Sequence, residues 1–282
     1  MRRRSASLDD ALAAHRERLA RAHRVRNKAG LLAMIDDLGF CFAFTLRTGD
    51  APLPAGFDHL ATTDEGKKWE WMWGWKDEIA EAKEAYYGAL LVRKPTFVSK
   101  RLLPAFYATF GRAGEPDDHL EDVRAGRLSD LGRRVVEFLT QNGETQTKRM
   151  RATLGIVSKE GKREYDKAVD EVQRLMYVSL VRAVGETHED YNYTYDLFTR
   201  RYPEAVRAAE RLASAEAAEV VLGRALELAG AMTPKQAERL FDWEADRVAR
   251  TAARLERAGR LARTGTGKEA LFVLASLLAR KP

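Results

Sequence analysis

Three arginines near the C-terminus have a spacing that places them on one face of a helix. Arg247, Arg250 and Arg254 stand at positions i, i+3 and i+7 of a stretch with helical periodicity. Side chains of this kind donate hydrogen bonds to phosphates and to base edges. Arg263 and Lys268 flank a following Gly-containing turn, where a further phosphate contact is common. These residues predict a polyanion, and nucleic acid in particular, as the partner.

A second basic group lies in the middle of the chain, on a short predicted helix and at the start of a longer one. Its members are Lys148, Arg149, Arg151, Lys162, Arg163 and Lys167. Phosphate contacts from such residues set affinity and its salt dependence, and they do not select a sequence. Acidic residues interrupt both basic groups, so a solvated charged surface is the alternative. The interrupting acids are Asp166, Asp170, Glu171, Glu244, Asp246 and Glu256.

The net charge of +6 is unevenly distributed along the 282 residues. Residues 1–30 carry nine Lys or Arg and three Asp or Glu, a net of +6. Residues 231–282 carry eleven basic and six acidic residues, a net of +5, which leaves about −5 for the middle. Basic ends around a mildly acidic middle again favour a polyanion partner.

The composition indicates a soluble protein without an internal disulfide or a Cys-rich metal site. Cys41 is the single cysteine, so the chain has no internal disulfide and no Cys-rich zinc site. The five histidines show no metal-ligand spacing. No apolar run reaches the roughly 18 residues that span a bilayer. We expect a cytoplasmic, nucleoid-associated monomer without cofactor, metal or membrane partner.

Two stretches share one predicted order of elements. Each reads as helix, short helix, turn, longer helix and a two-stranded hairpin, which is the order of a winged helix, a form of helix-turn-helix. In the later stretch, Thr233 and Pro234 form a helix N-terminus and Gly230 ends the preceding helix. The predicted fold class is therefore mainly α with short β hairpins (α+β), built of tandem winged-helix modules. The module boundaries are 129–200 and 214–282.

The N-terminal residues have a less regular pattern. A helix is predicted over 26–38, with Gly39 as its stop, followed by a short buried strand FCFAFTL and a loop over 48–66. The segment WEWMWGWK holds Trp69, Trp71, Trp73 and Trp75 at a spacing of two, which in a strand places them on one face. A helix is expected to begin at Lys76 and continue to about Leu91.

Several short motifs resemble the AlkZ-like (YcaQ-like) winged-helix DNA glycosylase superfamily. They are IDDLGFCF (35–42), WGWKDEI (73–79), YYGALLVRKPTFVS (86–99) and YNYTYDLF with the following Arg201-Tyr202-Pro203. The sequence is most similar to the AlkZ-related winged-helix DNA-binding proteins that lack the catalytic glutamine motif. The resemblance implies three winged helices around a concave basic surface that binds duplex DNA. It also implies that residues 1–110 hold a divergent first module with an inserted Trp-rich segment, whose Trp73 and Trp75 belong to the core.

The resemblance departs from the glycosylases at their catalytic residues. Those enzymes carry a Gln paired with Gln or Asp, two positions apart, just after the Leu-Gly-aromatic step. Our alignment places Phe42 and Phe44 there, and a register shift of one gives Cys41 and Ala43. None of these side chains can hold a catalytic water or stabilise an oxocarbenium-like sugar.

Three functions are consistent with these patterns. The first is a DNA-binding protein without base-excision activity, in genome maintenance or regulation. The second is a monofunctional DNA glycosylase for alkylated or crosslinked bases, with catalytic residues elsewhere, at Asp58 or His59 after the long loop. The third is a protein-interaction module. The candidate site for the first function comprises the eleven basic residues named above, and no catalytic residue is assigned.

Overall fold

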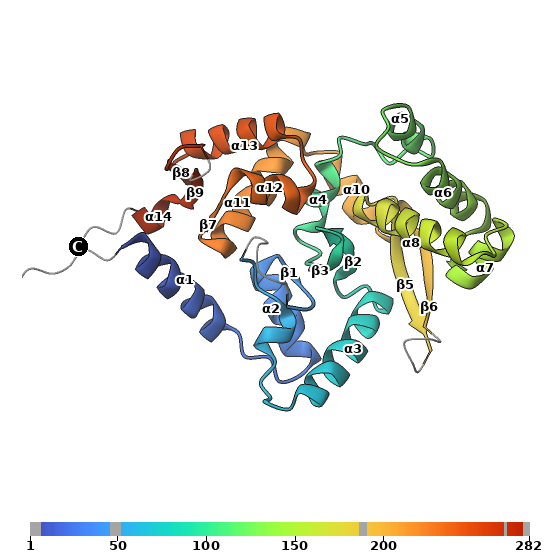
Figure 1. Ribbon diagram of the computed structural model, residues 1–282, viewed down its shortest axis with the longest axis horizontal. Helices are drawn as coiled ribbons and strands as arrows, with labels where there is room; N and C mark the ends of the chain where they lie inside the picture. The colour runs from blue at the N-terminus through green and yellow to red at the C-terminus, as the bar shows by residue number, and fades with distance from the viewer. Residues whose placement is uncertain (1–6, 46–51, 186–190, 268–269, 279–282) are drawn as a thin grey trace, which may run out of the picture. The chain divides into compact units, whose positions relative to one another are not determined.

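The computed structural model describes residues 7–45, 52–185, 191–267 and 270–278 (Figure 1). The chain forms two compact units, one of residues 1–72 with 214–282 and one of residues 73–213. It is mainly helical, with small antiparallel sheets of short strands, which confirms the predicted fold class. The three-module division at 1–110, 129–200 and 214–282 remains a prediction.

The first unit begins with two capped helices and a short strand. Their bounds are α1 Leu8–Ala22, α2 Lys28–Leu38 and β1 Phe40–Phe42, followed by the 3-10 helix η1 Gly56–His59. Ser7 and Asp10 form a capping box at the start of α1. Gly39 ends α2 with φ 76°, a conformation that glycine adopts without steric cost, as its position in the sequence predicted.

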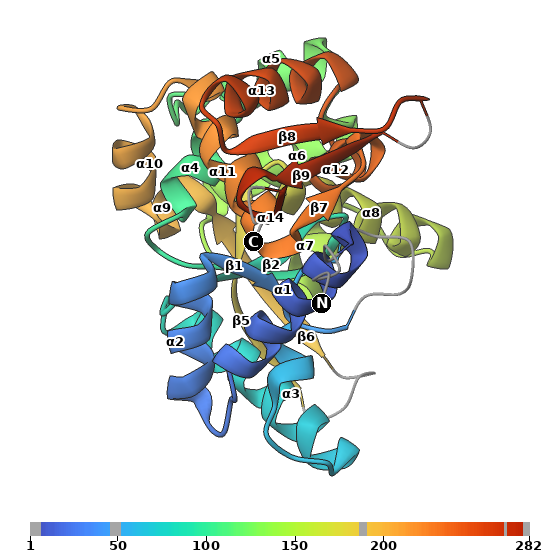
Figure 2. The same cartoon turned by 90° about the vertical axis from the view of Figure 1, so that its left-hand side faces the viewer.

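The C-terminal module of the first unit occupies residues 214–278 of the described chain. It contains α11 Ser214–Ala229, β7 Ala231–Met232, α12 Pro234–Phe241, α13 Ala245–Arg257, β8 Leu261–Thr264, β9 Leu271–Leu274 and α14 Ala275–Leu278. The strand order is β7-β9-β8, with β9 antiparallel to both neighbours. Figure 2 shows these three strands beside one another with α13 along the hairpin. The three helices and the hairpin predicted within residues 214–282 are observed in the predicted order, whereas β7 and α14 were not predicted.

Local sequence signals explain where the helices of this module begin and end. Thr233 caps α12 through a capping box with Gln236, and Pro234 occupies its first turn. Gly230 ends α11 with φ 77°. The apolar side chains of α13 at Val248, Ala252 and Leu255 are buried, and the remaining face of that helix carries its charged residues.

Helix α1 is part of the same unit because it packs against the C-terminal module. Leu12 joins Ala231, Val273 and Leu277 in one apolar cluster. The Nε2 atom of His15 lies 2.9 Å from the carbonyl oxygen of Glu227. Residues more than 200 positions apart therefore form one core.

The second unit contains a β hairpin followed by a second module. Its elements are β2 Tyr86–Leu91, β3 Lys94–Val98, α4 Leu103–Ala108, α5 Asp118–Arg124, α6 Asp130–Asn142, β4 Thr145–Gln146, α7 Thr147–Thr153, α8 Lys159–Arg174, β5 Val178–Val184, β6 Asn192–Leu197, α9 Phe198–Arg201 and α10 Pro203–Ala209. From α6 to β6 the order matches the C-terminal module, and the strand order β4-β6-β5 matches it as well. The elements predicted within residues 129–200 are thus confirmed.

The prediction for the tryptophan segment was wrong. Its four tryptophans lie in helix α3, Glu65–Glu81, and residues 86–91 form a strand. The helical signal was the spacing of Met72, Lys76 and Ile79, which are all fully buried. Gly74 does not break the helix, since its exposed position costs only about 1 kcal/mol relative to alanine.

A spacing of two distributes the four indoles around the helix instead of placing them on one face. Trp69 is 50% exposed and packs on Phe44 and Phe57, with ring centroids 5.2 and 4.9 Å away. The other three indoles are half-buried. The resemblance implied that Trp73 and Trp75 belong to the core, and both are half-buried.

Among the described residues, no helix combines the length and apolar character needed to cross a bilayer.

Candidate nucleic-acid interface

The exposed face of α13 carries a row of four arginines. Arg247, Arg250 and Arg254 share this face as predicted, and Arg257 continues the series at i+10. At about 100° per residue, the four side chains lie within about 80° of one another around the axis. This face is distinct from the one that Val248 and Leu255 bury in the module core.

The arginine row lines a surface pocket of about 570 Å³ between α13 and the start of α11. We call it the arginine pocket and define it by Arg247, Arg250, Arg254, Arg257 and Ser214. Arg247 donates a hydrogen bond to the Oγ of Ser214 at 3.2 Å, and its guanidinium lies 4.5 Å from the ring centroid of Trp243. These contacts fix the side chain of Arg247, whereas the side chains of the other three arginines are exposed to solvent.

The charges around the arginine pocket are only partly balanced. Arg254 lies 3.0 Å from Glu219, and Arg250 lies 3.6 Å from Asp246, in a pair whose side chains are 74% and 89% exposed. Such exposed pairs contribute little and exchange readily for other anions. Burial, and then the neighbouring charge of Arg250, lower the pKa of Arg247. An anion in the pocket would relieve the repulsion between these cations.

Arg263 and Lys268 were predicted to flank the turn of the C-terminal hairpin, and the structure describes Arg263 but not Lys268. Arg263 lies on β8, 3.0 Å from Glu256 of α13, with its guanidinium over the ring of Phe272. It is exposed and beside the helix that carries the arginine row. Lys268 lies outside the described residues.

The basic residues of the middle module do not form one group. Lys148, Arg151 and Lys162 line a pocket of about 500 Å³ between α7, α8 and β6. Arg163 and Lys167 lie on the neighbouring exposed face of α8, where Lys167 pairs with Glu164 at 2.8 Å. Arg149 is exposed on α7 and does not line that pocket.

Four residues that line these two pockets were not predicted as site residues from the sequence. Arg257 could have been found by extending the i, i+3, i+7 series by one step. Tyr191, Tyr193 and Tyr195 line the pocket of the middle module, and their alternation in YNYTY was read only as a strand signal. The alternation also predicts that the three rings lie on one face, with Tyr191 just before the first residue of β6.

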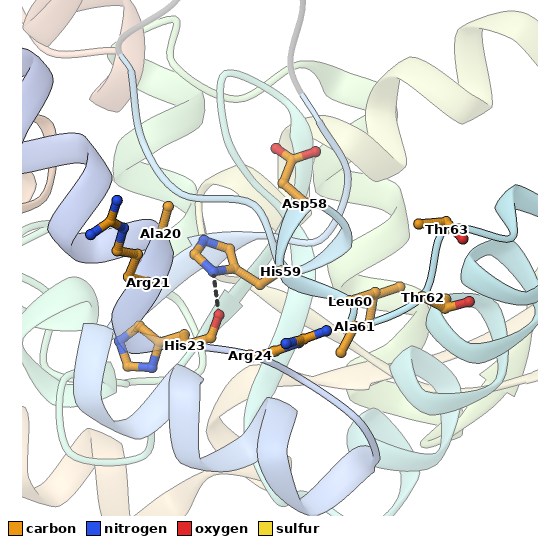
Figure 3. Close-up of a pocket in the computed structure, with 10 residues that line it drawn as sticks. All are labelled: Ala20, Arg21, His23, Arg24, Asp58, His59, Leu60, Ala61, Thr62 and Thr63. Carbon is orange, nitrogen blue, oxygen red and sulfur yellow. Dashed lines mark hydrogen bonds between the residues drawn. The ribbon is translucent and has the colours of Figure 1, made fainter.

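A third pocket lies in the first unit, around Asp58 and His59 (Figure 3). Its volume is about 770 Å³, and Arg21, His23 and Arg24 also line it. The carbonyl oxygen of His23 can only accept, so the Nδ1 of His59, 3.0 Å away, is the donor. The Nε2 of neutral His59 is then an acceptor, as a general base requires.

Asp58 and His59 do not form a catalytic pair with each other. Figure 3 shows their side chains pointing in different directions from η1. The carboxylate of Asp58 accepts a hydrogen bond from the hydroxyl of Thr45. Each group would have to act independently on a substrate in this pocket.

The residues aligned with the glycosylase catalytic pair are apolar and packed. Phe42 is fully buried, and Phe44 belongs to the aromatic cluster with Phe57 and Trp69. Cys41 and Ala43 are fully buried too. Neither register of the alignment therefore presents a polar group to a substrate.

The Cys41 thiol is expected to be unreactive in the folded protein. Burial raises its pKa to about 12, so the nucleophilic thiolate is scarce at neutral pH. We expect Ellman's reagent at pH 8 to modify less than a tenth of the thiol in an hour under native conditions, and all of it in denaturant. Rapid modification of the native protein would contradict the burial of Cys41.

Among the described residues, no group of three or more His, Cys, Asp or Glu side chains is placed to hold a metal ion.

The chain contains two modules with the same order of elements, and each of them carries a basic surface. The AlkZ-related family model matches residues 25–242, and the chain belongs to this family. The solved structure of the Streptomyces sahachiroi DNA glycosylase AlkZ is similar at a TM-score of 0.58 and 13% sequence identity. The match covers 99% of this chain and 73% of that one, and it shows a shared fold. No curated protein matches the sequence.

Proposed function

We propose that this protein binds duplex DNA through its two basic modules and does not excise bases. The modules are winged helices, in which α12 and α7 brace the helices α13 and α8 that face the DNA. The phosphate contacts come from the predicted basic residues, including Arg149, Arg163 and Lys167. The family and the fold of a DNA glycosylase support DNA as the partner, in genome maintenance or regulation.

The arginine pocket is the observation that carries this proposal. Four arginines stand on the exposed face of α13, the helix that follows the turn in the C-terminal module. Phosphates bind such a row through charge and through the planar fork of each guanidinium. A protein partner with a single acidic segment would also fit the row, and it would not require the second basic group on α7 and α8.

The proposal also carries over the predicted three-module arrangement, in which a divergent first module in residues 1–110 completes the DNA-binding surface. We expect the protein to act as a monomer near the nucleoid.

A mobility shift with intact and alkylated duplexes, followed by a strand-cleavage assay of the same samples, tests the proposal. We expect a shift of both duplexes at low salt, and no heat- or alkali-labile abasic sites in either. Base release from the alkylated duplex would contradict the proposed lack of excision. Failure to shift either duplex at 50 mM salt would leave only the protein-interaction function.

The pocket around Asp58 and His59 favours DNA glycosylase activity as the second candidate. It offers a carboxylate and a histidine whose Nε2 is an acceptor in the neutral form, which are the groups that activate water.

Variants of this pocket test the second candidate directly. If the protein excises alkylated bases, Asp58→Asn or His59→Gln should lower the single-turnover rate by about 100-fold, the usual effect of removing an acid or base. The control is Asp64→Asn, an exposed carboxylate next to α3 and outside the pocket. Excision that is absent in the wild type, or unchanged in both pocket variants, would rule out this site.

A further inference from the structure

The pocket of the middle module combines aromatic and basic walls in a way that duplex binding does not need. We call it the tyrosine pocket and define it by Tyr191, Tyr193, Tyr195, Lys148, Arg151 and Lys162. Successive tyrosine rings lie 5.4 and 6.2 Å apart between centroids along β6. Its volume of about 500 Å³ is in the range of small-molecule sites.

The tyrosines at the two ends of the aromatic wall, Tyr191 and Tyr195, are fixed by their surroundings. Tyr191 packs on Trp73, with ring centroids 5.2 Å apart, and its hydroxyl donates to the carboxylate of Asp77. Tyr195 is buried, whereas Tyr193 is half-buried between the other two. Tyr193 is therefore a preorganised ring that can offer surface to a ligand.

The basic wall is fixed to the same strand. The hydroxyl of Thr147 donates to the side-chain oxygen of Asn192 at 2.8 Å, and that oxygen also accepts the backbone N–H of Lys148 at 3.1 Å. These hydrogen bonds join the first turn of α7 to β6. They place Lys148 beside the tyrosines, although 45 residues separate the two segments.

The cations of this pocket retain capacity for a ligand. The buried Nε of Arg151 has no hydrogen-bond partner within the described parts of the chain, an expensive state unless something completes it. Lys148 is exposed, and Lys162 forms an exposed ion pair with Asp166, which also lines the pocket. An anionic group is the natural complement of these three donors.

An acidic group on α8 adds a third kind of contact. Asp170 also lines the tyrosine pocket and is half-buried. A carboxylate accepts hydrogen bonds from the exocyclic amino groups of nucleobases. The pocket therefore has partners for a flat ring, for a phosphate and for an amino group, which are all parts of a nucleotide.

We propose that the tyrosine pocket takes an unpaired nucleotide of DNA, with its base on Tyr193 and its phosphate on Lys148, Arg151 and Lys162. A base inside a duplex is stacked on both faces, so only a nucleotide that has left the stack can reach Tyr193. This inference rests on the proposed function and makes it more specific. The preferred substrate is DNA with an extruded, bulged or single-stranded nucleotide.

The test uses the full-length protein and fluorescence anisotropy with three labelled DNAs of one sequence. They are a paired duplex, the same duplex with one bulged nucleotide, and the single strand. We expect the wild type to bind the bulged duplex about tenfold more tightly than the paired one, the effect of stacking one base. Tyr193→Ala should abolish this preference without weakening binding to the paired duplex. Tyr193→Phe keeps the ring and should retain it.

The outcomes separate this inference from the proposed function. Equal affinity of the wild type for bulged and paired duplexes would overturn the nucleotide pocket, as would equal loss in the Ala and Phe variants. If the paired duplex is not bound at 50 mM salt, duplex binding is overturned. Single-strand binding that is lost in Tyr193→Ala and kept in Tyr193→Phe would then still support the pocket. Circular dichroism melts of both variants confirm that each is folded.

Discussion

Replacing Arg250 and Arg254 together by alanine is expected to weaken duplex DNA binding by about 10- to 100-fold at moderate salt. Both guanidinium groups belong to the exposed arginine row of α13, and neither holds the module core. Each lost phosphate contact should also reduce the slope of log K against log salt by about 0.9. Fluorescence anisotropy over a series of salt concentrations measures both quantities.

A matched control separates this effect from a simple change of net charge. Arg207 and Arg211 are exposed arginines on α10 and just after it, outside the basic groups. Their double alanine variant loses the same two charges and should bind within about twofold of the wild type, since surface substitutions away from a site change little. Equal weakening in the two double variants would show that the arginine row has no special role.

Arg201→Ala is expected to lower the free energy of unfolding of the second unit by about 3 kcal/mol or more. Arg201 is only 7% exposed, and its Nη2 donates to the carbonyl oxygens of Ala80, Glu81 and Val181. The first two belong to the last turn of α3, where carbonyls lack partners within the helix. The substitution removes these three hydrogen bonds and opens a cavity, and the carbonyl oxygen of Ala80 keeps the backbone N–H of Lys83 as a donor.

Urea denaturation followed by circular dichroism measures this change. Arg207→Ala, an exposed arginine six residues away, should change stability by no more than about 0.5 kcal/mol. Arg201→Lys should recover only part of the loss, because the lysine side chain is one bond shorter and its ammonium does not reach the position of Nη2, the nitrogen that donates to all three carbonyls. Equal stability of the Arg201 and Arg207 variants would mean that the buried hydrogen bonds contribute little.

The predictions from sequence succeeded where the signal was local. Thr233, Gly230 and Gly39 mark helix ends through contacts within four residues, and each has that role in the structure. The arginine row was predictable for the same reason, since helical spacing alone puts its members on one face.

The tryptophan segment and the tyrosine pocket could not be predicted from local signals. Alternating tryptophans suggested a strand, but the burial of Met72 and Lys76 depends on the tertiary surroundings of α3. Lys76 is 1% exposed, and it is stabilised by Asp77 at 2.7 Å and by the ring of Trp73 at 4.2 Å. No pattern rule predicts a buried lysine in such a place. Likewise, Lys148 and Tyr193 line one pocket because α7 is hydrogen-bonded to Asn192 of β6.

The salt dependence of duplex DNA binding tests the central claim most directly. If the basic residues of both modules contact phosphates, the affinity of the wild type for an undamaged 20-base-pair duplex should fall by about 10³-fold or more between 50 and 200 mM salt. The slope should be shallower for Arg250→Ala with Arg254→Ala, and unchanged for the Arg207 and Arg211 control. An affinity independent of salt, or no binding at 50 mM, would contradict the assignment of this protein to DNA.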